Sequence, residues 1–431
     1  MAGRPGYPLP MAVAETTVAE SCAAAKRAAR ELATASPEAK NAALEATARL
    51  LEKRSEEILE ANAGDLGDER AAGLTEALRD RLRLTPERVA AMAEGVRVVA
   101  ALDDPVGEEL ERKTLASGLD LRKVRVPLGV IAVVYEARPN VTIDCAALTI
   151  KSGNAIVLRG SSYAERSNAA LAAIVREALA EAGLPEDAVF ALGGGGHEEL
   201  AELATQEGLV DLLIPRGGEG LKAAIKKVAT VPVMYAAAGN CHVYVHADAD
   251  PEMARRIAVN AKVQRPGVCN AAETLLIDAA IAERFAPAVL ADLAAAGVEL
   301  VGDERARAAA GGVEVGAATD EDWGSEYLGL KMTVAVVDSV EDAIEHVNSH
   351  GTGHSEAIVT SSEEAAETFA TGVDAAAVYV NASTRFTDGF EYGMGAEIGN
   401  STQKLHARGP IGMRELTTFK YVAHGNGQVR E

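Results

Sequence analysis

Hydrophobic and polar positions follow a helical pattern from residue 11 to about residue 103. Ser36-Pro37 and Thr85-Pro86 in this stretch each place an N-capping side chain before a proline. Proline suits the first position of a helix, because its missing N–H would have no helical partner there. The start of the chain is therefore predicted to form a layer of helices.

The pattern changes between Lys113 and Val126, where polar and apolar residues alternate. Alternation with a period of two is typical of strands, and Ser117-Gly118 interrupts it as a turn would. We predict a β-hairpin that projects from the main body and serves contact between subunits.

Short apolar runs then alternate with amphipathic stretches, which is typical of a parallel, doubly wound sheet covered on both faces. This architecture suits nucleotide binding. Strands are predicted at Val130–Tyr135, Ala155–Leu158, Val189–Leu192, Leu209–Ile214 and Val231–Tyr235, and helices near Ile143–Ser152 and at Ala164–Ala182, His197–Glu207 and Gly218–Val228.

A second α/β series follows the strand predicted at His242–His246. Its helices are predicted at Pro251–Val263, Ala279–Ala295, Val340–Ser349 and Glu363–Ala370, and its strands at Glu273–Ile277, Thr333–Val337, Glu356–Thr360 and Ala376–Val380. We predict a cofactor-binding domain over residues 1–245, excluding the hairpin at about 108–126, and a catalytic domain over residues 246–380. The glycine-rich tail 381–431 is predicted to form, with 108–126, a bridging and oligomerisation element.

Composition supports a folded chain with more than one core. A length of 431 residues favours two domains, and 48% hydrophobic with 25% charged residues is typical of globular proteins. The formal charge of −22 disfavours binding to nucleic acid or to anionic membranes. Neither a signal peptide nor a membrane-spanning run is recognisable, so we expect a cytoplasmic protein.

Four cysteines, Cys22, Cys145, Cys241 and Cys269, are scattered without metal-ligand spacing, which disfavours structural zinc and a disulfide framework. Cys269 lies in a predicted loop between a helix and a strand, a position that suits a nucleophile. A lone cysteine is otherwise most often a buried packing residue, as Cys22 and Cys145 are predicted to be. Cys241, at the start of a strand, is the competing candidate.

A cysteine nucleophile also needs a donor for the developing oxyanion, and one such donor is worth about 2.7 to 4 kcal/mol. Asn140 follows a central strand at its carboxyl end, where open α/β sheets bind ligands. Its amide is therefore the candidate donor. An Asx-type cap of the following helix is an equally good interpretation of Asn140.

Two loops that join strands to helices are candidates for cofactor phosphates. Arg216, Gly217 and Gly218 offer a cation and exposed amides at a helix N-terminus. Arg159 and Ser161 follow a strand where an acidic residue usually holds the ribose, which favours NADP over NAD. A solvated surface arginine is the alternative for Arg159. Gly193 to Gly196 lack the third glycine of the dinucleotide fingerprint and form a weak motif.

Motifs along nearly the whole chain resemble the gamma-glutamyl phosphate reductases, a family within the aldehyde dehydrogenase superfamily. The resemblance implies an α/β fold with two doubly wound α/β domains and a small β oligomerisation arm. Its motifs include Tyr135-Glu136-Ala137-Arg138-Pro139-Asn140-Val141-Thr142, Ile214-Pro215-Arg216-Gly217-Gly218, Gly239-Asn240-Cys241-His242 and Val380-Asn381-Ala382-Ser383-Thr384-Arg385-Phe386. Especially specific is the ending Gly395-Ala396-Glu397-Ile398-Gly399 with Lys404-Leu405-His406-Ala407-Arg408-Gly409-Pro410.

The resemblance assigns roles to individual residues. It implies Cys269 as nucleophile, Asn140 as oxyanion amide, and Glu326 as the acid that holds the nicotinamide ribose, although a surface glutamate is the alternative. Arg159 and Arg216 are implied as cofactor contacts. Arg138, Arg265 and Arg385 are candidates for binding the substrate carboxylate or the leaving phosphate, and each fits a structural ion pair equally well.

The implied reaction is the NADPH-dependent reduction of L-glutamyl 5-phosphate to L-glutamate 5-semialdehyde and phosphate, the second step of proline biosynthesis from glutamate, with no metal. Ala236-Ala237-Ala238-Gly239 stand where hydrolytic relatives have a glutamate base, so water should attack the thioester poorly. The expected partners are further copies of the chain, and an association with glutamate 5-kinase is conceivable. Another acylating or phosphorylating aldehyde dehydrogenase, or a non-catalytic cofactor-binding scaffold, are the alternatives.

Overall fold

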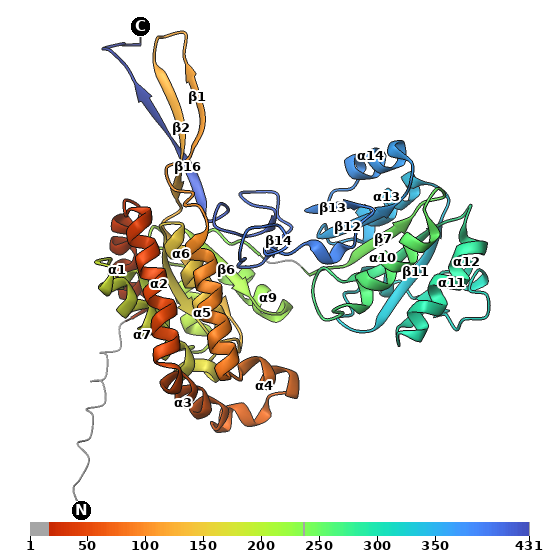
Figure 1. The fold of residues 1–431 in the computed structure, drawn as a ribbon, viewed down its shortest axis with the longest axis horizontal. Helices are drawn as coiled ribbons and strands as arrows, with labels where there is room; N and C mark the ends of the chain where they lie inside the picture. The colour runs from red at the N-terminus through yellow and green to blue at the C-terminus, as the bar shows by residue number, and fades with distance from the viewer. Residues whose placement is uncertain (1–16, 236–237, 431) are drawn as a thin grey trace, which may run out of the picture. The chain divides into compact units, whose positions relative to one another are not determined.

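The computed structural model describes residues 17–235 and 238–430, which divide into two compact units (Figure 1). Unit 1 comprises Met1–Met234 together with Met413–Glu431, and unit 2 comprises Tyr235–Gly412. Each unit has its own sheet and its own buried core.

Unit 1 opens with the predicted helices, which are α1 (Val18–Leu32), α2 (Pro37–Lys53), α3 (Ser55–Leu66), α4 (Glu76–Leu82) and α5 (Pro86–Ala101). Ser36 and Thr85 cap α2 and α5 through their side chains, as predicted, and each is followed by proline. Residues 11–16 of the predicted helical layer lie outside the described residues. Across the described chain, every helix is too short or too polar to cross a membrane.

The sheet of unit 1 is parallel and has the order β5-β4-β3-β6. Because the chain moves outward from β3 to β5 and then returns to the other side of β3, the strand order reverses between β3 and β6. Ligands of open α/β sheets bind at the carboxyl ends of strands beside such a reversal. The elements are β3 (Val130–Tyr135), α6 (Asn140–Lys151), β4 (Ala155–Arg159), α7 (Glu165–Glu181), β5 (Val189–Leu192), α8 (His197–Ala204), β6 (Leu212–Arg216) and α9 (Glu219–Val228).

The prediction of a strand at Val231–Tyr235 is wrong. Val233 forms only an isolated parallel bridge with Leu213. Pro232 in its middle has no N–H to donate to a neighbouring strand, which restricts proline to edges and short pairings.

A three-stranded antiparallel arm projects from unit 1 (Figure 1). The predicted hairpin is confirmed as β1 (Glu109–Thr114) and β2 (Asp120–Pro127). A third strand near the end of the chain, β16 (Thr417–His424), pairs with β2 along its whole length. The sequence prediction placed the tail with the hairpin but did not identify this strand.

Unit 2 contains a parallel sheet of seven strands in the order β10-β9-β11-β8-β7-β12-β13. Alternate residues of its strands point to opposite faces. Val243 and Leu275 pack in one core with helices α10 and α11, whereas Tyr244 and Leu276 pack in the other with α13 and α14. The elements are β7 (Cys241–Val245), α10 (Pro251–Val263), β8 (Ala272–Asp278), α11 (Ala282–Ala295), β9 (Glu299–Gly302), α12 (Glu304–Ala308), β10 (Gly316–Ala317), β11 (Lys331–Val337), α13 (Val340–His350), β12 (Ser355–Val359), α14 (Glu363–Gly372) and β13 (Ala377–Val380).

The unit boundaries differ from the predicted domains at two places. Unit 2 begins at Tyr235 rather than at residue 246, because β7 pairs with β8 and β12 in its sheet. The tail does not act as one element, since residues 381–412 belong to unit 2 and residues 413–431 to unit 1. The part in unit 2 contains the short pair β14 (Asn400–Ser401) and β15 (Gly409–Pro410).

Candidate active site

Cys269 lies in unit 2, in the loop that joins α10 to β8, as predicted. Its side chain is partly accessible, whereas Cys22, Cys145 and Cys241 are buried. Burial raises the pKa of the Cys22 thiol to about 11 and that of Cys145 to about 12, and it holds the pKa of Cys241 well above the ordinary value. These three thiols are therefore protonated near neutral pH, which leaves Cys269 as the cysteine that can react.

The loop of Cys269 is fastened to its surroundings by hydrogen bonds on both sides. The Asn270 side chain donates to the carbonyl of Thr387 at 2.9 Å, and the Thr384 hydroxyl donates to the carbonyl of Asn270 at 2.7 Å. The buried thiol of Cys241 donates to the carbonyl of Cys269 at 3.2 Å. Cys241 thus supports the loop, which explains its place in the motif without a nucleophilic role.

Gly239 connects the nucleophile loop to Glu326. A Cβ built on Gly239 would lie 1.4 Å from the carbonyl oxygen of Cys269, so no side chain fits at this position. The amide of the same glycine donates to Glu326 Oε1 at 2.8 Å. Glu326 is half-buried and bonded to the backbone beside Cys269, which is not the environment of a plain surface glutamate.

Two of the predicted arginines lie near the nucleophile in unit 2. Burial, and then the charge of Arg265, lower the pKa of Arg385, whereas Cys269 raises it, so the three side chains are within electrostatic reach of one another. Arg385 donates through Nε to Gln264 at 2.9 Å. Neither Arg385 nor Arg265 forms an ion pair with any described residue. Within the described ranges neither arginine is neutralised by a carboxylate, which leaves both charges available to an anion.

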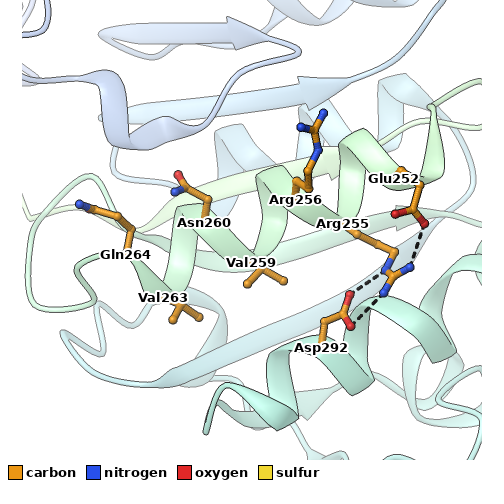
Figure 2. Close-up of a pocket in the computed structure, with 8 residues that line it drawn as sticks. All are labelled: Glu252, Arg255, Arg256, Val259, Asn260, Val263, Gln264 and Asp292. Atoms are coloured by element: carbon orange, nitrogen blue, oxygen red, sulfur yellow. Dashed lines mark hydrogen bonds and ion pairs between the residues drawn. The ribbon is translucent and has the colours of Figure 1, made fainter.

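A separate groove of about 520 Å³ lies on α10 and α11 of the same unit (Figure 2). Two arginines line it, Arg255 and Arg256, and Arg255 is paired with Asp292 and Glu252 at 2.7 and 2.9 Å. Cys269 does not line this groove. The groove therefore lacks the nucleophile, and we assign it no part in the reaction.

Asn140 lies in unit 1 at the carboxyl end of β3, on the first turn of α6. Pro139 occupies the N-cap position and the helix has no side-chain cap, so the interpretation of Asn140 as an Asx cap is wrong. Its amide instead donates to Asp144, one turn along α6, at 2.9 Å. Burial raises the pKa of Asp144 to about 6, although Asn140 and the charge of Arg216 lower it.

The neighbouring strand β6 ends at Arg216, which is in register with Tyr135 of β3. The helix α9 that follows has Gly218 at its N-cap position and no side-chain cap, so the amides at its N-terminus suit an anion. The exposed Glu136 accepts the Gly218 amide at 3.2 Å. These groups fit a cofactor phosphate at this edge of the sheet, provided that Glu136 releases the amide.

Arg159 and Ser161 follow β4 on the other side of β3. Arg159 donates to Glu199 at 3.2 Å and to the carbonyls of Gly195 and Gly196, so it is not a simple solvated arginine. The Ser161 hydroxyl accepts from the Tyr163 amide at 3.1 Å. Arg159 therefore holds the loop 193–196, whereas Ser161 caps the short helical turn at Ser162–Ala164.

The structure groups the predicted residues within each unit. Unit 2 brings together Cys269, Arg265, Arg385 and Glu326. Unit 1 contains Asn140 and Arg216 with its two glycines, and Arg138 lies exposed just before Pro139. Residues 236 and 237 of the proposed base-free segment lie outside the described residues. Sequence analysis missed the contacts of Gly239, Asp144 and Cys241; the motif containing Gly239 and Cys241 was the only signal available.

Known proteins resemble this chain over almost its whole length. The pattern of the aldehyde dehydrogenase family matches residues 9–323 and 318–422. Proteins named gamma-glutamyl phosphate reductase from Thermobifida fusca and Koribacter versatilis are each 53% identical, over 94% and 96% of this chain and 97% and 100% of their own. The crystal structure of gamma-glutamyl phosphate reductase from Thermotoga maritima matches with a TM-score of 0.93 at 45% identity, over 96% of this chain and 100% of that one.

These matches confirm both the predicted resemblance and the predicted fold class. The family match covers well over half of the sequence. The chain therefore belongs to the aldehyde dehydrogenase family.

Proposed function

We propose that this chain reduces L-glutamyl 5-phosphate to L-glutamate 5-semialdehyde and phosphate with NADPH, the second step of proline biosynthesis from glutamate. Relatives that carry the name of this activity are 53% identical over more than nine tenths of the chain. The observation that carries the proposal is the accessible Cys269, joined through Gly239 to Glu326 and flanked by Arg265 and Arg385.

The first step is acyl transfer to sulfur. The Cys269 thiolate attacks the acyl carbon, the C–O bond to phosphate breaks, and phosphate leaves with both electrons of that bond. We propose that Asn140 and the amide of Cys269 stabilise the tetrahedral oxyanion. Arg265 and Arg385 supply positive charge for the phosphate or for the substrate carboxylate, and Arg138 is a third candidate for this role.

The second step converts the thioester to the aldehyde. A bound nicotinamide would supply the hydride, and we propose that the cofactor would be held by Arg159, Ser161, Arg216, Gly217, Gly218 and Glu326. The hemithioacetal on Cys269 then collapses, which releases the aldehyde and restores the thiolate. The arginine and serine after β4 favour NADPH over NADH, because a 2′-phosphate needs donors where NAD enzymes place an acid.

The sequence Ala236-Ala237-Ala238-Gly239 carries no side chain that could activate water. Hydrolysis of the thioester would need such a base. The acyl group should therefore remain on Cys269 until it is reduced.

The direct test is oxidation of NADPH by the purified chain with L-glutamyl 5-phosphate, or phosphate-dependent reduction of NADP⁺ with the semialdehyde in reverse. Cys269→Ala should abolish both rates, whereas Cys241→Ala should retain measurable turnover. Activity in Cys269→Ala would exclude the thioester mechanism. Preference for another acyl phosphate or an acyl thioester would redirect the substrate assignment, and NADPH binding without any turnover would indicate a scaffold.

A further inference from the structure

A buried ion pair between Lys262 and Glu273 joins the two ends of the loop that carries Cys269 in unit 2. Lys262 lies in the last turn of α10 and Glu273 at the start of β8, so the two residues flank the loop that carries Cys269. Their side chains form a salt bridge and both are 0% exposed. The mechanism proposed above gives this pair no task.

Such a pair is not explained by stability alone. Removing two charges from water costs several kcal/mol per ion, and apolar residues of similar volume are often at least as stable. Burial raises the pKa of Glu273, which Lys262 lowers in turn, and burial likewise lowers the pKa of Lys262, which Glu273 raises. Each charge is therefore maintained by the other, and the pair needs a reason in the structure around it.

The pair also contacts the turn that carries Glu326. The ring of Tyr327 lies under the ammonium of Lys262, with 5.8 Å between Nζ and the ring centroid. The backbone of Leu328 faces Glu273 and lowers the pKa of that carboxyl. Lys262 and Glu273 thus touch the two residues that follow Glu326, one partner each.

This turn has a conformation that needs support. Leu328 has a φ of +53°, a region that costs a residue with a Cβ on the order of 1 kcal/mol or more and persists only when its surroundings enforce it. Tyr327 is anchored on its other side, where its hydroxyl bonds Asp322 at 2.9 Å and Thr333 at 2.7 Å. Lys262 and Glu273 therefore contact this turn from the two elements that flank the Cys269 loop.

We infer that Lys262 and Glu273 are positioning residues that couple the Cys269 loop to the Glu326 turn. They thereby fix the position of the nucleophile relative to the cofactor-binding acid. The role assigned to Glu326 rests on the proposed function. The geometry is independent of it, because one ion pair borders both segments while Gly239 joins them on a second side.

The test separates positioning from stability. Lys262→Met and Glu273→Leu should each lower the Tm, since each leaves one buried charge unpaired, and the double variant should recover most of the loss. The double variant should nevertheless bind NADPH at least tenfold more weakly, measured by the fluorescence of NADPH on titration, and its Cys269 alkylation rate should change at least threefold. A double variant with native Tm, native NADPH affinity and native alkylation rate would overturn the inference.

Two further variants keep the test decisive. Arg255→Met removes an ion pair of the same helix α10 that does not touch either segment, and it should leave the NADPH affinity within twofold. Glu273→Gln keeps the shape of the side chain while removing its charge, and it should weaken NADPH binding at least threefold. An unchanged affinity in Glu273→Gln would overturn the inference even if the double variant failed to fold.

Failure of this inference can be distinguished from failure of the proposed function. A wild-type chain that binds NADPH but does not reduce L-glutamyl 5-phosphate would refute the substrate assignment, while the binding and alkylation comparisons would still decide the role of the pair.

Discussion

Burial divides the four cysteines into three protonated thiols and one that can react. Iodoacetamide at pH 7 to 7.5 should therefore label Cys269 and leave the buried thiols of Cys22, Cys145 and Cys241 unmodified over the same period. Peptide mass spectrometry reads the site directly. Prior addition of the acyl phosphate substrate should slow labelling, and labelling of Cys241 at a comparable rate would contradict the assignment.

The amide of Asn140 is expected to act on the transition state rather than on binding. Asn140→Ala should lower kcat by roughly a hundredfold, as for other single oxyanion donors, with the KM for NADPH within about twofold. Steady-state kinetics with varied NADPH separates the two parameters. A near-normal kcat would leave Asn140 with only its hydrogen bond to Asp144.

Asp144 should make unit 1 less stable as the pH rises. Its pKa is raised to about 6, so the folded state binds the proton more tightly than the unfolded state and the stabilising contribution is lost between about pH 4 and pH 6. Asp144→Asn removes this penalty and should raise the free energy of unfolding by about 2 to 3 kcal/mol at pH 8 and by about 1 kcal/mol near pH 4.5. Thermal unfolding followed by circular dichroism at both pH values should show a Tm gain that grows with pH; a constant gain would refute the titration.

The candidate site divides into residues that a sequence can reveal and residues that it cannot. Cys269 and Asn140 were predictable because each lies beside a recognisable strand. Asn140 follows β3, and Cys269 lies between α10 and β8. Gly239 matters through a contact across 30 positions of chain, where its Cα packs on the Cys269 carbonyl, and no local pattern encodes that approach. The side-chain partners of Arg159 were likewise invisible, because Glu199 lies on a different element.

Helix caps were predicted correctly and their energies can be tested. Ser36 accepts the amide of Ala39 at 3.2 Å at the start of α2. Ser36→Ala should destabilise unit 1 by about 1 kcal/mol, because that amide loses its partner, and this should lower the Tm by about 2 to 4 °C. Circular dichroism melts measure the change. Ser36→Thr retains a hydroxyl acceptor and should cost much less, so an equal loss in both variants would exclude the cap as the cause.

Most helices and strands were predictable because apolar periodicity reports burial directly. The helix at Pro251–Val263 and the strand at Val189–Leu192 have the predicted bounds. The short strand β9 (Glu299–Gly302) escaped prediction because only two of its four residues, Leu300 and Val301, are bulky and apolar. The strand β16 escaped because its burial pattern is almost wholly exposed, so it has no apolar face to recognise.

The arm of unit 1 carries an exposed aromatic pair, and we propose that a further copy of the chain covers it. Phe419 and Tyr421 of β16 are 45% and 57% exposed and their rings contact each other, with centroids 5.7 Å apart. Exposed aromatic pairs on an edge strand are typical of a surface that another chain covers. Light scattering after size exclusion should therefore give a multiple of 44.7 kDa for the wild type.

Charge on this surface should separate the subunits. Phe419→Glu with Tyr421→Glu should shift the mass towards 44.7 kDa, because carboxylates cannot be buried unpaired in an interface. Phe390→Glu is the matched control, since Phe390 is 68% exposed in unit 2 and should not alter the mass. A monomeric wild type, or an unchanged mass in the double variant, would show that the arm does not form the contact between subunits.

The pairing of β16 with β2 has a consequence for biosynthesis. Unit 1 needs residues from both ends of the chain, whereas unit 2 is made of one continuous stretch between them. On a translating ribosome, which releases residues in order and lets domains form as they emerge, the inserted unit can be complete before the first-made one is. The hairpin of β1 and β2 is thus made before unit 2, and the outer edge of β2 has no partner strand until β16 has been synthesised.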